Sequence, residues 1–105
     1  NERNNSLMKA FANGLIMYKR KNTDYGDSAY NTLKLCGETS GYSRITDKWM
    51  RLTSLMLNNK SEVGDESIED TMLDMMNYSA IILSWVSDGR PRLTSADELI
   101  DSMGK

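Results

Sequence analysis

Residues 66–87 read ESIEDTMLDMMNYSAIILSWVS, the longest stretch of the chain with an uninterrupted helical pattern. Its first turns are acidic, and its second half is apolar on nearly every side. A helix that is apolar all round is normally buried among other helices. The turn at 88–91, DGRP, ends the pattern, and Asp65 is a candidate N-cap. The stretch therefore predicts a central helix over about 66–87.

Shorter amphipathic segments flank this helix on both sides. The 3.6-residue apolar period and the turn residues between segments predict three earlier helices and one later helix. Ser95 and Glu98 form a capping box at the start of the last helix. No segment alternates as a strand. We therefore predict one all-α domain over residues 1–105, a compact bundle of four to five helices without a sheet. The flanking helices are expected over about 6–22, 28–35, 40–58 and within 94–105.

Charge and composition exclude several classes of protein. Lys and Arg total 13 against 15 Asp and Glu, a net charge of -2, whereas nucleic-acid binders usually present a basic face. The chain contains no histidine, which excludes histidine-based triads and His-Cys zinc sites. The single cysteine, Cys36, cannot form an intramolecular disulfide, and we interpret it as a small buried hydrophobe.

Location and assembly are also predicted from composition. No apolar run reaches the roughly 20 residues that a membrane span needs, and no signal peptide is visible. We therefore expect a soluble cytoplasmic protein without membrane contact. A chain of 105 residues buries only a thin core. Its broadly apolar helices and eight methionines predict that it forms a homo-oligomer.

An acidic stripe runs along the predicted central helix. Glu66, Asp70, Asp74 and Asn77 are spaced i, i+4, i+8 and i+11, which places them on one side. Neighbouring carboxylates repel one another unless a cation lies among them, and Mg²⁺ prefers oxygen ligands. The three acids are therefore candidate Mg²⁺ ligands. The alternative interpretation is an acidic first turn favoured by the helix dipole, together with salt bridges.

A basic stripe lies on the preceding helix. Arg44, Lys48 and Arg51 are spaced i, i+4 and i+7 and share one face. Three cations on one face require an anion nearby, and a ligand phosphate is one candidate. The acidic stripe itself is the other, in which case the two stripes simply pair between adjacent helices.

The turn between the first two predicted helices is the third candidate feature. Asp24, Tyr25, Gly26 and Ser28 fall within the sequence DYGDS, where aspartate and glycine are turn residues. Backbone N–H groups, a tyrosine ring and a hydroxyl in one turn suit a nucleotide base or phosphate. The alternative is that the turn only connects two helices.

Three separated blocks of sequence resemble the nucleotide modification associated domain 1 family. They are KNTDYGDS at 21–28, RITDKWMRL at 44–52 and DESIEDTMLDMMNY at 65–78, and the likeness extends over about 10–85. The resemblance implies a small helical domain, a nucleotide context and a phage or prophage origin, but no reaction. Asn77 and Tyr78, which end the third block, join the candidate ligand-binding residues.

A remoter likeness connects the chain with the MazG-type all-α nucleotide pyrophosphohydrolases. Those enzymes bind Mg²⁺ with acids on two neighbouring helices. Here the earlier helix carries the basic stripe instead, and only the stripe of Glu66, Asp70 and Asp74 is comparable.

Three functions follow as hypotheses. The first is a binder of a small phosphate-bearing nucleotide, such as a phage anti-defence protein that sequesters a host signalling nucleotide in the host cytoplasm. The second is a Mg²⁺-dependent nucleotide pyrophosphohydrolase. The third is a structural helical interaction module. Whether the protein is an enzyme is left open by the sequence.

Overall fold

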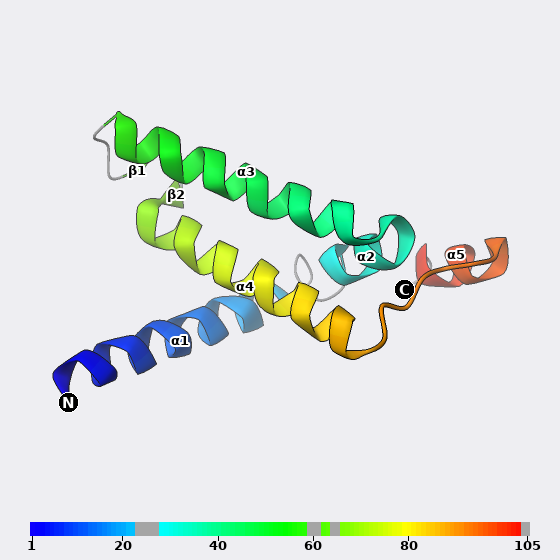
Figure 1. Ribbon diagram of the computed structural model, residues 1–105, viewed down its shortest axis with the longest axis horizontal. Coiled ribbons are helices and arrows are strands. Elements are labelled where there is room, and N and C mark those ends of the chain that lie inside the picture. Colours follow the sequence, from blue (N-terminus) through cyan, green and yellow to red (C-terminus); the bar gives the residue numbers. More distant parts are fainter. Residues whose placement is uncertain (23–27, 59–61, 64–65, 104–105) are drawn as a thin grey trace.

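The computed structural model describes residues 1–22, 28–58, 62–63 and 66–103. Its described residues form five helices, which confirms the predicted all-α class (Figure 1). The extended residues among them pair as one antiparallel ladder of two residues per strand, which is too short to form a layer. The elements in chain order are α1 (Glu2–Arg20), α2 (Tyr30–Cys36), α3 (Glu38–Leu57), β1 (Glu62–Val63), β2 (Glu66–Ser67), α4 (Ile68–Ser87) and α5 (Ala96–Met103).

Helix α4 is the centre of the bundle, as its apolar second half predicts. It packs against α1, α2 and α3 (Figure 1). Ile81 and Trp85 are buried in one cluster with Met17 of α1 and Leu33 of α2. The indole Nε1 of Trp85 donates a hydrogen bond of 2.9 Å to the carbonyl of Pro91. The bond satisfies the one polar group that this ring brings into the core.

The start of α4 differs from the prediction. The N-cap is Ser67, whose hydroxyl accepts a hydrogen bond of 3.1 Å from the amide of Asp70. Asp65, the predicted cap, lies outside the described residues. Glu66 belongs to β2 rather than to the helix. The short β1–β2 ladder keeps this backbone extended, so α4 begins two residues later than predicted.

Helices α2, α3 and α4 approach one another closely at Gly41. A β-carbon at this position would lie 2.7 Å from Cδ1 of Ile82 and 3.2 Å from Cδ2 of Leu33. Glycine therefore has a packing reason to stand inside α3, where it otherwise lowers helix stability. This contact fixes the distance between α3 and α4 on the N-terminal side of the basic stripe.

The segment after α4 is fastened to the end of α2. Arg92 donates hydrogen bonds to the carbonyls of Lys34 and Leu35 at 3.1 and 3.2 Å, and thereby caps the last turn of α2 with a cation. Gly37 adopts a φ of +79°, and a β-carbon there would lie 2.7 Å from Nη1 of Arg92. Gly37 ends α2, because glycine suits both conditions.

Two smaller predictions have opposite outcomes. Ser95 accepts from the amide of Glu98 at 3.2 Å, so the predicted cap of α5 is confirmed. The carboxylate of Glu98 in turn accepts a hydrogen bond of 2.8 Å from the amide of Thr94. The expectation that Cys36 is buried is wrong. It is exposed at the last position of α2, where Leu33 takes the inward-facing position instead.

Candidate functional site

The basic stripe lines a cavity between α3 and α4. Arg44, Lys48 and Arg51 of α3 line it together with Tyr78 of α4, and its volume is about 340 Å³. Because these cations lie on one face of α3, they border the same open space. The structure thus brings together four of the residues that the sequence marked as ligand-binding.

Arg44 and Tyr78 form one wall of this cavity. The guanidinium carbon of Arg44 lies 5.6 Å from the centroid of the Tyr78 ring, within the range of a cation–π contact. Such contacts are worth about 0.5–1 kcal/mol at exposed sites. The contact restrains the guanidinium at the cavity wall, so less conformational entropy is lost when it binds an anion.

Asp74 supports the cavity from the α4 side. Its side chain is only 5% exposed, and its Oδ2 lies 3.0 Å from Nζ of Lys48. Its Oδ1 lies 3.7 Å from Nζ of Lys21, the residue that caps the C-terminus of α1. Lys21 at the end of α1 and Lys48 of α3 therefore both contact the buried carboxylate of Asp74. Pairing is what allows a charge to be buried here.

The other two acids of the predicted stripe lie in different elements. Asp70 lies in the first turn of α4, where a negative charge is favoured by the helix dipole. Glu66 precedes the helix, in β2. Among the residues that the structure describes, no three His, Cys, Asp or Glu side chains lie close enough together to hold a metal ion.

Asn77 does not join the basic cavity. Its amide nitrogen donates a buried hydrogen bond of 3.0 Å to the carbonyl of Gly14 in α1. A β-carbon added at Gly14 would lie 3.2 Å from Cε of Met76, the end of a flexible side chain, and 3.9 Å from Oδ1 of Asn77. Asn77 thus serves the packing of α1 on α4, although the helical spacing alone placed it with the acids.

The predicted DYGDS turn is only partly visible. Asp24, Tyr25 and Gly26 lie outside the described residues. Ser28 is exposed, and its carbonyl accepts a hydrogen bond of 2.7 Å from the hydroxyl of Thr32. Lys21, which precedes the turn by a few residues, contacts Asp74.

Two residues of the site were missed by the sequence analysis. Asp47 also lines the cavity, and its spacing of i+3 from Arg44 and i−4 from Arg51 signalled that it shares their face. Lys21 has no such spacing relation to the basic stripe. Its contact with Asp74 joins residues 53 positions apart and has no local signal.

The matched family model covers residues 21–84 and is described as nucleotide modification associated domain 1. The chain belongs to this family. The match includes α2, α3, most of α4 and all the residues that line the basic cavity, and it confirms the resemblance carried by the three blocks. The chain matched no curated protein and no solved structure. None of the described helices is long and apolar enough to cross a membrane.

Proposed function

We propose that the chain binds a small nucleotide through its phosphate group, in the cavity between α3 and α4. The observation that supports this most is that Arg44, Lys48 and Arg51 line one open cavity. Arginine offers paired N–H donors that match phosphate oxygens, and charge-assisted bonds of this kind are among the strongest hydrogen bonds in proteins. The family description adds a nucleotide context.

The dimensions of the cavity favour a small ligand. Its volume of about 340 Å³ lies at the lower end of the roughly 300–1,000 Å³ typical of small-molecule sites. A single nucleotide or its phosphate end fits this range, whereas an extended polymer requires a groove. The net charge of -2 also speaks against nucleic acid as the ligand.

The contacts beneath the cavity prepare it for an anion. Asp74 holds Lys48 at 3.0 Å, and Tyr78 lies against Arg44. Cations that are already oriented lose less conformational entropy on binding.

We favour binding without turnover. Both carboxylate oxygens of Asp74 contact lysine ammonium groups, so a Mg²⁺ ion would have to displace two cations to reach this carboxylate. Sequestration of a host signalling nucleotide by a phage protein, in the host cytoplasm, fits a binder of this kind. A Mg²⁺-dependent pyrophosphohydrolase is the alternative, and it requires Asp70 and Asp74 to exchange their present surroundings for a metal.

Self-association is part of the proposal. The described residues expose many large apolar side chains on α1, α3 and α4. Contiguous apolar surface on a small domain commonly marks a protein interface. We propose that the chain acts as a homo-oligomer.

A thermal-shift screen tests the binding proposal. Mono-, di-, tri- and cyclic nucleotides are added to the protein with and without Mg²⁺. A ligand that binds only the folded state raises the unfolding midpoint by mass action, so at least one nucleotide should raise it without Mg²⁺. If no nucleotide raises the midpoint under either condition, the binding proposal is wrong.

Recovery of the ligand separates a binder from an enzyme. The protein is incubated with the nucleotide that it binds and with Mg²⁺, then denatured by heat, and the supernatant is resolved by anion-exchange chromatography. A binder returns the ligand intact. Release of a monophosphate and pyrophosphate from a triphosphate would favour the hydrolase instead.

A further inference from the structure

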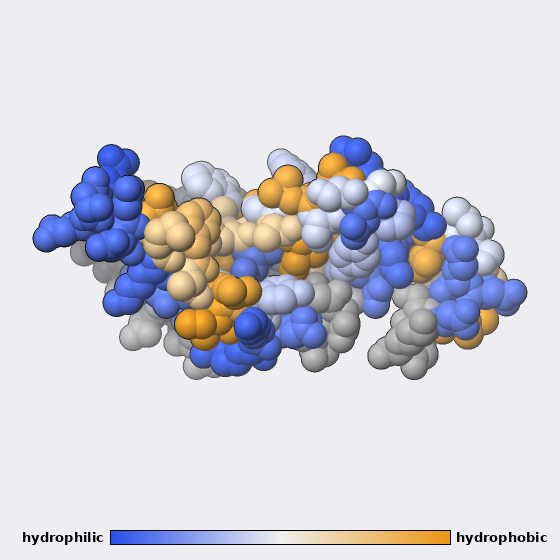
Figure 2. All heavy atoms as spheres, turned by 90° about the horizontal axis from the view of Figure 1, so that it is seen from below, coloured by the Kyte–Doolittle hydropathy of each residue, from blue (hydrophilic) through white to orange (hydrophobic). Residues whose placement is uncertain are grey.

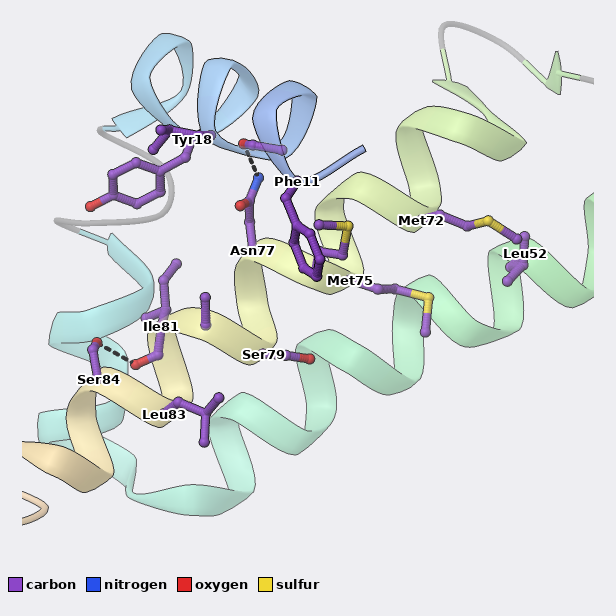
Figure 3. A pocket seen from close by; sticks show the side chains of 14 residues that line it. Phe11, Tyr18, Leu52, Met72, Met75, Asn77, Ser79, Ile81, Leu83 and Ser84 are labelled. Carbon is purple, nitrogen blue, oxygen red and sulfur yellow. Dashed lines mark hydrogen bonds between the residues drawn. The ribbon is translucent and has the colours of Figure 1, made fainter. Parts of the chain in front are cut away.

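A second and larger hollow lies between α1 and α4, on the side of α4 that faces away from the basic cavity (Figure 3). It is an open groove of about 870 Å³. Fourteen residues line it, including Phe11 of α1, Met75 and Leu83 of α4 and Leu52 of α3, and none of the fourteen is charged. No residue lines both this groove and the basic cavity. An uncharged and mostly apolar lining suits an apolar occupant.

The helix that forms one wall of the groove is itself largely unpacked. Every residue from 1 to 13 is exposed, although 2–13 are helical. Leu7, Phe11 and Leu15 are 54, 57 and 55% exposed. Helical segments shorter than about 12–15 residues are marginal in water without tertiary contacts. The first half of α1 therefore receives little stabilisation from tertiary contacts within the described chain.

The overall dimensions also indicate that part of the chain extends away from the bundle. The radius of gyration is 15.8 Å, whereas a globular domain of 100 residues has one of about 13 Å. Helix α1 extends away from the bundle toward its N-terminus (Figure 1). Figure 2, which views the molecule from the side of α1, shows apolar residues gathered between hydrophilic ends. An apolar segment thus extends from the bundle beside an apolar groove.

We propose that the groove is filled by α1 of a second copy, which runs antiparallel with a two-fold axis at Phe11. The spacing supports this symmetry, because Leu7 and Leu15 lie four residues before and four residues after Phe11. Under such an axis Leu7 of one copy faces Leu15 of the other, and the two Phe11 rings meet. The inference rests on the proposed self-association and adds its surface and symmetry.

A second copy suits the groove because the surface is self-complementary. The apolar stripe of α1 and the groove beside it lie on the same molecule, so one two-fold contact buries both stripes and fills both grooves. Isologous contacts of this kind close on themselves and leave no further surface for growth. The resulting assembly is a dimer with α1 and α4 of both copies at its centre.

A matched pair of substitutions tests the surface. Phe11→Glu places two like charges at the axis, whereas Ile16→Glu places the same charge on a side chain of similar exposure, 61%, that does not line the groove. Sedimentation equilibrium should give twice 11.9 kDa for the parent and for Ile16→Glu, and a monomer for Phe11→Glu. Circular dichroism checks that helix content is retained apart from fraying of α1.

Cysteine cross-linking tests the register without destabilising the contact. In a Cys36→Ser background, Phe11→Cys should form an intermolecular disulfide under mild oxidation, because a cysteine on the axis meets its own copy. Ile16→Cys should not. A monomeric parent overturns both self-association and this surface. A dimer that persists in Phe11→Glu, or cross-links only through Ile16→Cys, overturns this surface alone. Nucleotide binding, which uses other residues, is measured separately.

Discussion

At the residue scale, Asp74 joins the packing of the bundle to the cavity. It is buried, and it contacts Lys48 at 3.0 Å and Lys21 at 3.7 Å. A carboxylate without a cation is costly at this depth, and each lysine offsets part of that cost. The same pairing orients Lys48 beside Arg44 and Arg51. One residue therefore contributes to stability and to the shape of the candidate site.

Replacing Asp74 with asparagine should lower the free energy of unfolding. Loss of one partner from a fully buried pair costs about 3–5 kcal/mol, and we expect about 2–3 kcal/mol here because both lysines are partly exposed. Urea denaturation measures the change. Asp101→Asn, at an exposed residue of α5 outside its first turn, is the control and should be close to neutral. Equal stability of Asp74→Asn and the parent would contradict the assigned role.

Tyr30 gives a prediction about pH. Its hydroxyl donates a hydrogen bond of 2.6 Å to Asp88. This bond is the main reason that the pKa of Tyr30 lies above its ordinary value of 10.0. Burial and the charge of Asp88 raise the pKa further. A raised pKa in the folded state means that the contribution to stability is complete below about pH 10 and is lost as pH rises through the folded pKa. Stability should therefore fall in strongly alkaline solution.

The variant Tyr30→Phe should show a smaller alkaline loss of stability than the parent. Asp88→Asn, which removes the acceptor carboxylate, should reduce the loss in the same way. Unfolding midpoints measured between neutral pH and strongly alkaline pH make the comparison. Parallel pH profiles for the parent and Tyr30→Phe would show that the bond does not contribute.

At the element scale, the sequence predicts helices better than it predicts their ends. Apolar period and turn residues located all five helices, since both are local properties. The start of α4 was placed too early because Glu66 and Asp70 have helical spacing, and spacing cannot reveal that β2 pairs with β1. The partners of Asn77 and Lys21 lie far along the chain. Contacts of that kind depend on how helices pack and leave no trace in local sequence.

Gly41→Ala tests the close approach of α3 and α4. Alanine favours a helix by about 1 kcal/mol over glycine, but its β-carbon would lie 2.7 Å from Ile82. Overpacking of this kind costs about 1–3 kcal/mol, so the substitution should be destabilising overall. Gly14→Ala is the matched control, because its nearest neighbour is the flexible end of Met76. Thermal unfolding compares the two.

Relief of the same contact provides a second check. Ile82→Ala removes Cδ1 and Cγ1, the two atoms that would lie 2.7 and 2.8 Å from the new β-carbon. The double variant should therefore lose less stability than the sum of its two single substitutions. Additive losses would mean that the two side chains do not meet in the way the structure places them.

At the scale of the whole molecule, α4 separates two surfaces of different character. Tyr78 and Asp74 face the basic stripe of α3, whereas Met75 and Leu83 line the apolar groove beside α1. The sequence could predict the basic surface, because three cations at helical spacing lie on one face of a helix. It could not predict the groove, because the apolar period of α1 predicts a buried stripe without revealing what covers that stripe.

Calorimetric titration of a nucleotide into the parent and two arginine variants tests the central proposal most directly. The nucleotide that most raises the unfolding midpoint is titrated without Mg²⁺ into the parent, Arg44→Ala and Arg3→Ala. Arg3 is exposed on α1, away from the cavity. Loss of a charged hydrogen bond worth about 1.5–3 kcal/mol should weaken binding to Arg44→Ala about 10- to 100-fold, while Arg3→Ala binds as the parent does. Equal affinity of Arg44→Ala and the parent would contradict a phosphate site between α3 and α4.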